Sequence, residues 1–131
     1  MIAYVDTNVL VRHLTNDPPQ QARRATAILE NAERLILTDV VVAELVYVLE
    51  SYYERPRRHI AESVQSLLTL SSIAVYNHDL LLRALELYEH TRLDFAEAYL
   101  AAAAELTGVG TVASFDRALD RVETIDRVHD I

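Results

Sequence analysis

Met-Ile-Ala-Tyr-Val-Asp-Thr-Asn, residues 1–8, is the stretch of sequence that decides the fold. Residues 2–5 form a short apolar run of the length that a buried strand needs. Asp6, Thr7 and Asn8 follow, and these residue types are common where helices begin. The stretch therefore predicts a buried strand that leads directly into a helix, with an acidic side chain at the junction.

The same alternation of apolar runs and helical patterns continues along the whole chain. We expect strands at 2–5, 35–37, 73–76 and 111–113, and a weak edge strand at 123–125. We expect helices at 6–14, from Pro18, from Thr38, from Pro56, at 79–90, at 94–106 and at 116–119. Strands that alternate with helices are typical of an α/β fold. The sequence thus predicts a mostly parallel twisted sheet of about five strands flanked by helices.

Length and composition limit what kind of protein this is. A chain of 131 residues is large enough for one domain, which we expect to span 1–131. The chain has no cysteine, which excludes disulfides, thiolate metal sites and cysteine nucleophiles. No apolar run reaches the roughly 18–20 residues of a membrane helix, and the N-terminus lacks the basic segment of a signal peptide. We therefore expect a cytoplasmic protein with no membrane partner.

Charge alone argues against a nucleic-acid partner, because the formal net charge is −8. Metal ions that neutralise carboxylates would weaken this argument. Every one of the 12 basic residues is an arginine, which binds phosphate well, although genomic composition also explains such usage. We predict that Arg12, Arg57 and Arg58 contact the substrate, with a solvated helix start as the alternative for Arg57 and Arg58.

Acidic residues stand at the ends of apolar runs at four separate places. They are Asp6, Glu44, the pair Asp94 and Glu97, and Asp116. In open parallel sheets the carboxyl ends of the strands meet at one edge, so these acids are expected to converge. Clustered carboxylates repel one another unless a cation offsets their charge, and hard divalent ions prefer oxygen ligands. The sequence therefore predicts a Mg2+ site, which Mn2+ could also fill.

Each acid has a predicted role and an ordinary structural alternative. All five are predicted to bind metal, and the acids of the catalytic site are predicted to be Asp6, Glu44, Glu97 and Asp116. Helix capping is the alternative at Asp6, Asp94 and Asp116. Glu44 is expected to face inward because valines and leucines flank it, with an ordinary surface position as the alternative. Metal ions in such a site activate water for phosphodiester hydrolysis. Further substrate contacts are predicted at Thr7, Asn8 and Ser114.

Four motifs together resemble the PIN-domain ribonucleases of the VapC toxin type. The motifs are Tyr-Val-Asp-Thr-Asn-Val-Leu at 4–10, Val-Val-Ala-Glu-Leu at 41–45, Leu-Asp-Phe-Ala-Glu-Ala-Tyr-Leu-Ala-Ala at 93–102 and Thr-Val-Ala-Ser-Phe-Asp at 111–116. The resemblance implies a single PIN-like domain, a Mg2+-dependent endoribonuclease that cleaves RNA such as tRNA, a homodimer and a small cognate antitoxin. The family usually has Asp where this chain has Glu97, with Asp94 one turn earlier. Which of the two binds metal is left open.

Other hypotheses about the function of the same residues stay open. A receiver-like signalling domain also has acids at strand ends, but it uses a lysine at the phosphate and this chain has none. Phosphate-loop and dinucleotide-binding proteins need glycine-rich loops, and the chain has only two glycines. A non-catalytic PIN module that binds RNA or protein is the remaining alternative.

Overall fold

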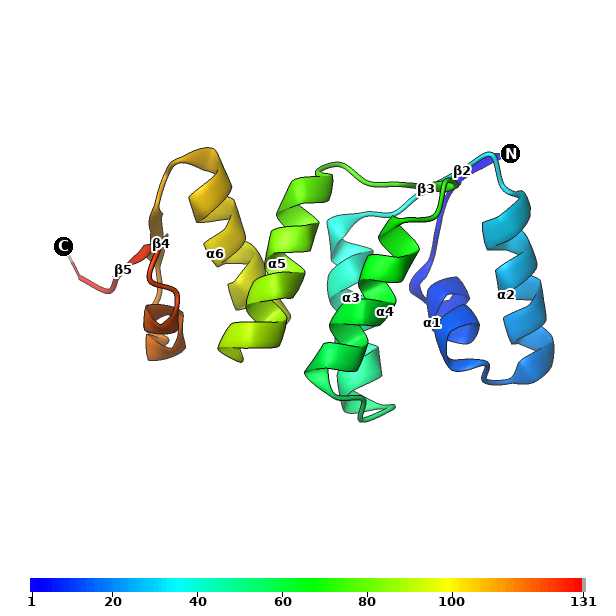
Figure 1. The fold of residues 1–131 in the computed structure, drawn as a ribbon, viewed down its shortest axis with the longest axis horizontal. Helices are drawn as coiled ribbons and strands as arrows, with labels where there is room; N and C mark the ends of the chain where they lie inside the picture. The colour runs from blue at the N-terminus through cyan, green and yellow to red at the C-terminus, as the bar shows by residue number, and fades with distance from the viewer. Residues whose placement is uncertain (131) are drawn as a thin grey trace. The chain divides into compact units, whose positions relative to one another are not determined.

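The computed structural model describes residues 1–130, and the chain falls into two compact units. The first unit is Met1–Tyr76, and the second begins at Asn77. Each unit contains helices and a pair or more of parallel strands (Figure 1). The predicted α/β class with parallel strands is therefore confirmed. That residues 1–131 form a single domain stays a prediction.

The first unit is built around a parallel sheet with strand order β1-β2-β3. Its elements are β1 Ile2–Tyr4, α1 Thr7–Thr15, α2 Pro19–Asn31, β2 Arg34–Ile36, α3 Asp39–Ser51, α4 Arg57–Leu68 and β3 Ile73–Ala74. The register places Ala3 opposite Leu35, and Leu35 opposite Ile73. In this unit α1 packs against α2 and α3 packs against α4 (Figure 1). These elements agree with the predicted ones to within a few residues.

The second unit pairs two helices and adds a two-stranded parallel sheet. Its elements are α5 His78–Thr91, α6 Phe95–Thr107, β4 Thr111–Ala113, the 3-10 helix η1 Arg117–Arg121 and β5 Asp126–Val128. Gly108 ends α6 with a φ of 78°, and Gly110 has a φ of 72° before β4 begins. Both values lie in the left-handed region that glycine enters at little cost. The predicted turn between α6 and the fourth strand is thus confirmed.

The last strand lies three residues later than the sequence pattern indicated. We predicted it at 123–125, whereas β5 is Asp126–Val128. The chain instead turns at 122–125, where Val122 and Ile125 are buried. After this turn the backbone N–H of Asp126 donates to the Gly110 carbonyl at 2.8 Å, which starts the pairing with β4. The apolar residues of the segment therefore fill the core of the unit rather than a strand face.

Each unit has its own apolar core. In the first unit the fully buried side chains include Leu10, Leu45 and Ile60, from three different helices. In the second unit Tyr88 is fully buried and packs edge-on against Phe95, with ring centroids 6.4 Å apart, which joins α5 to the start of α6. No helix within residues 1–130 is long and apolar enough to cross a membrane.

Candidate active site

Three acidic side chains of the second unit lie together where α6 begins and β4 ends. Asp94 caps α6, and its Oδ1 accepts a hydrogen bond from the backbone N–H of Glu97 at 2.8 Å. Asp116 follows β4 and caps η1, where its Oδ1 accepts from the backbone N–H of Ala118 at 2.9 Å. The Glu97 carboxyl group is in hydrogen-bond contact with both aspartate side chains. Asp94 and Asp116 therefore cap helices and also belong to the acidic cluster around Glu97.

The surroundings of Glu97 favour its protonated form. Burial is the largest cause that raises the pKa of Glu97 to about 7, and the neighbouring carboxyl groups of Asp94 and Asp116 contribute in the same direction. By contrast, the Ala118 N–H that donates to Asp116 lowers the pKa of Asp116, and its contact with Glu97 lowers it too. In the metal-free protein at neutral pH, Glu97 is thus protonated in a large fraction of the molecules, next to an ionised Asp116.

Arginines lie near the cluster without occupying it. Arg127 donates to Asp120 at 3.0 Å and to the Ser114 carbonyl at 3.1 Å, and Arg121 donates to backbone carbonyls of the α5–α6 turn. Their positive charges lower the pKa of Asp116 from a distance. No ion pair within residues 1–130 joins an arginine to Asp94, Glu97 or Asp116. The carboxylates therefore stay available to another cation.

The donor atoms of this cluster suit a hard divalent cation. Glu97 Oε2 is buried and has no hydrogen-bond partner in the part of the chain that the structure describes. A buried oxygen without a partner is costly, and carboxylate oxygens are the ligands that Mg2+ and Mn2+ prefer. Across residues 1–130, no three or more His, Cys, Asp or Glu side chains are arranged so that they could together hold a metal ion, and this includes Asp94, Glu97 and Asp116. The cluster is thus a set of candidate ligands.

Asp6 joins β1 to α1 in the first unit, and its side chain is not used as a helix cap. Its backbone has the extended conformation of a capping residue, but its exposed carboxylate makes no capping hydrogen bond. The next residue, Thr7, is only 3% exposed, and its Oγ1 is buried without a hydrogen-bond partner among the described residues. The capping alternative is therefore wrong for the Asp6 side chain, which leaves this carboxylate free to bind a ligand.

Glu44 does not face inward, and that prediction was wrong. The side chain of Glu44 is exposed, because α3 buries the opposite face of the helix. The buried positions are Val42, Leu45, Val46 and Leu49, which follow the spacing of one helical face. The run of valines and leucines around Glu44 therefore wraps around the helix and does not enclose the acid.

The predicted substrate-contacting residues have different surroundings. Ser114 uses its Oγ to accept the backbone N–H of Asp116 at 3.0 Å, so it shapes the loop that carries the acid. Arg58 pairs with Glu62 at 3.0 Å on the exposed first turns of α4. Asn8 is exposed on the first turn of α1. Arg12 lies one turn further on and donates its Nε to Gln21 Oε1 at 2.9 Å.

The similarity of the sequence to known protein families shows which family the chain belongs to. The family model of the PIN domain matches residues 3–125, nearly the whole chain. The chain belongs to the PIN domain family. Members of this family are nucleases, a class of hydrolases, and generally depend on divalent metal ions. The resemblance to PIN domains stated from the sequence motifs is therefore confirmed.

Among solved structures, this PIN domain is similar to a chain in the crystal structure of VapBC2 from Rickettsia felis bound to a DNA fragment from their promoter. The two share 15% sequence identity over 98% of each chain, with a TM-score of 0.40. No curated protein matches the sequence.

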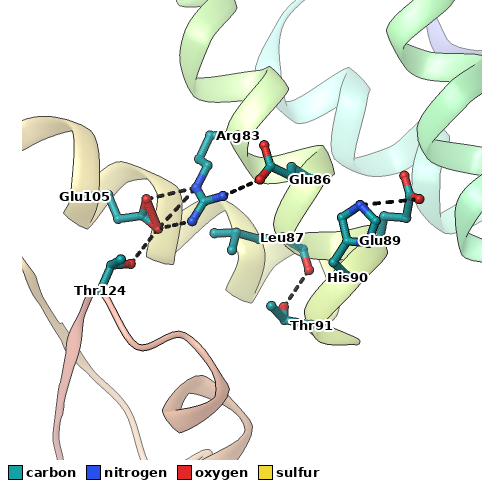
Figure 2. Close-up of polar contacts among 8 residues, drawn as sticks. All are labelled: Arg83, Glu86, Leu87, Glu89, His90, Thr91, Glu105 and Thr124. Carbon is teal, nitrogen blue, oxygen red and sulfur yellow. Dashed lines mark hydrogen bonds and ion pairs between the residues drawn. The ribbon is translucent and has the colours of Figure 1, made fainter.

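A polar network that the sequence did not reveal holds α6 in the PIN domain (Figure 2). Arg83 on α5 donates to both carboxylate oxygens of Glu105 on α6, at 2.9 and 3.0 Å, and to Glu86 at 2.7 Å. Thr124 donates its hydroxyl to the same Glu105 carboxylate at 2.9 Å. The Arg83 hydrogen bond lowers the pKa of Glu105, which keeps it ionised. The network therefore fixes the helix whose first turn carries Glu97.

The raised pKa of Glu97 predicts how the stability of the metal-free PIN domain depends on pH. Between the ordinary value near 4.5 and the folded value of about 7, the folded state binds more protons than the unfolded state. The free energy of unfolding should therefore fall as pH rises through this window, by on the order of 2 kcal/mol. Urea unfolding in EDTA at pH 5, 6, 7 and 8 measures this change. Glu97→Gln should flatten it; an equal slope in this variant would contradict the assignment.

Proposed function

We propose that this PIN domain is a metal-dependent endoribonuclease that hydrolyses RNA phosphodiester bonds. Family membership supports the nuclease class, since a PIN model covers residues 3–125. The observation that carries the proposal for this chain is the group of three carboxyl groups at Asp94, Glu97 and Asp116, with the unpartnered Oε2 of Glu97. This group has the donor atoms that Mg2+ requires, with Mn2+ as a substitute.

The proposed metal-binding residues are those predicted from the sequence: Asp6, Glu44, Asp94, Glu97 and Asp116. When bound, a divalent cation supplies Lewis-acid activation of the phosphate and of water. Asp116 enters the reaction already ionised, because backbone and cationic neighbours favour its charged form. Glu97 must lose the proton that it holds in the metal-free state before it can bind a cation, so metal binding should strengthen as pH rises through about 7.

We further propose that the RNA is a structured one such as tRNA, and that the protein is the toxin of a type II toxin–antitoxin pair, with a small antitoxin protein and a homodimeric state. The resemblance of the four sequence motifs to VapC-type toxins supports the proposed substrate, toxin role, antitoxin partner and homodimer. A non-catalytic PIN module that binds RNA or protein is the second candidate. It is favoured by Glu97, which stands where the family usually has aspartate. Membership of the PIN family removes the reason for a receiver-like alternative.

RNA cleavage by the purified full chain separates these functions. With Mg2+ or Mn2+, labelled tRNA should be cut, and EDTA should stop the reaction because no side chain replaces the cation. Asp6→Asn should reduce the rate about 100-fold, since it removes a proposed metal-binding charge. Asp126→Asn, a matched change at an exposed position of β5, should cleave like the wild type. Cleavage that persists in EDTA, or that Asp6→Asn does not alter, would refute the metal mechanism.

A further inference from the structure

A pocket of about 230 Å³ lies between α1 and α2 in the first unit, where the two helices pack side by side (Figure 1). We call it the α1–α2 pocket. It is lined by Asn8, Val9, Arg12, Gln21, Arg24, Ala25 and Ile28. The polar residues of α1 are four positions apart and those of α2 are three apart, so each set lies on one face of its helix. The pocket thus combines two guanidinium groups with two amides and an apolar floor.

In the part of the chain that the structure describes, the two arginines of the α1–α2 pocket have no acidic partner. Neither Arg12 nor Arg24 takes part in an ion pair within residues 1–130. Gln21 accepts the Nε–H of Arg12 at 2.9 Å, which fixes the guanidinium and leaves its two terminal nitrogens available. Two like charges in one pocket, one of them held in place, favour an anionic ligand.

We propose that the α1–α2 pocket binds a backbone phosphate of the RNA substrate through Arg12 and Arg24. Guanidinium groups fork onto phosphate oxygens, and most protein contacts to nucleic acids are made with phosphate and sugar. The apolar floor, formed by Val9, Ala25 and Ile28, offers a surface on which the adjoining nucleoside can lie. The inference rests on the proposed ribonuclease function and adds to it the residues that hold the strand.

The position of the pocket along α1 supports this role. Asn8 lines the pocket on the first turn of α1, two residues after Asp6. Arg12 lies one turn further along, at a rise of about 6 Å for four residues of helix. A strand held at the pocket therefore passes the end of the helix that carries the Asp6 carboxylate. Arg12 and Arg24 are positioning residues in this arrangement, because they hold the strand without taking part in the cleavage.

RNA binding without cleavage tests the proposal. The affinity of the full chain for a fluorescein-labelled single-stranded RNA is measured by anisotropy in EDTA at several salt concentrations. Arg24→Gln should weaken binding about tenfold, as expected for the loss of a charged hydrogen bond. It should also reduce the slope of log affinity against log salt by about 0.7, the value for one phosphate contact on a single strand. Arg12→Gln should act in the same direction.

Arg23→Gln is the matched control, because Arg23 is the neighbouring exposed arginine on α2 and does not line the pocket. It should bind RNA with an affinity within about twofold of the wild type. Circular dichroism checks that each variant keeps its helices, and if Arg12→Gln fails to fold, the comparison of Arg24→Gln with Arg23→Gln decides. Equal affinities and slopes for these two variants would overturn the proposal.

A competition experiment distinguishes RNA from an acidic protein segment as the occupant. Polyphosphate should displace the RNA from the wild type much better than poly-glutamate of equal charge, and this difference should shrink in Arg24→Gln. Equal displacement by both polymers would overturn the proposal in favour of a carboxylate-bearing partner. If the wild type fails to cleave RNA with Mg2+ yet Arg24→Gln still weakens binding, the pocket assignment stands and the ribonuclease proposal fails.

Discussion

Glu97→Gln should reduce Mg2+-dependent RNA cleavage by about 100-fold, the largest loss that we expect on α6. Glutamine keeps the length of the side chain but removes the charge that a cation needs. The physical basis is the buried Oε2 of Glu97, which has no hydrogen-bond partner within the described residues. Mn2+ binding measured by calorimetry should weaken together with cleavage. This second measurement separates a lost metal ligand from a lost substrate contact.

Asp94→Asn should reduce RNA cleavage much less than Glu97→Gln does. The comparison of these two variants decides which acid of the pair binds metal. One oxygen of Asp94 already accepts the Glu97 backbone N–H at 2.8 Å. Asparagine caps helices about as well as aspartate, so α6 should keep its start in this variant. We expect less than about a tenfold loss of cleavage, because only a neighbouring charge is removed.

Glu123→Gln is the control for the change at Glu97, since Glu123 is exposed in the same unit and outside the acidic cluster. It should cleave RNA at the wild-type rate. If Asp94→Asn abolishes cleavage and Mn2+ binding while Glu97→Gln retains both, then the aspartate is the ligand and the assignment is reversed.

Arg83→Met should destabilise the protein by roughly 2–4 kcal/mol, the largest loss of stability that we expect from one surface-reaching substitution. Arg83 and Glu105 are only 28% and 16% exposed, so the carboxylate would be left partly buried without its cation (Figure 2). Thr124 donates to that carboxylate but carries no charge. Urea unfolding at pH 7 measures the change. The double variant Arg83→Met/Glu105→Met should recover much of the loss, because it also removes the unpaired charge.

Arg58→Met provides the matched control for the change at Arg83. The Arg58–Glu62 ion pair has a similar length of 3.0 Å, but its side chains are 80% and 57% exposed. Solvent screens such a pair, and its loss should cost less than about 1 kcal/mol. Equal destabilisation by Arg83→Met and Arg58→Met would show that the network adds nothing beyond a surface ion pair.

Most of the fold could be predicted from the sequence because its signals are local. The apolar run at 2–5, the Thr38 cap of α3 and the glycine turn after α6 each depend on neighbouring residues, and all are present in the structure. The error in β5 has a tertiary cause. A short apolar segment can form a strand or fill a core, and Val122 and Ile125 fill the core of their unit.

The residue types of the candidate site were also evident in the sequence, because acids directly after apolar runs are visible without a structure. The surroundings of these acids in the folded protein were not evident from the sequence. Whether Glu44 faces inward depends on which side of α3 meets other helices, and that side is the one with Val42 and Leu45.

Only tertiary contacts bring Glu97 to Asp116, Arg83 to Glu105, and Arg12 to the same pocket as Arg24. The chain by itself thus determined which chemical groups are present and on which elements they stand. Tertiary packing decided which of them lose water and meet, because desolvation and charge pairing act between residues that are distant in the sequence.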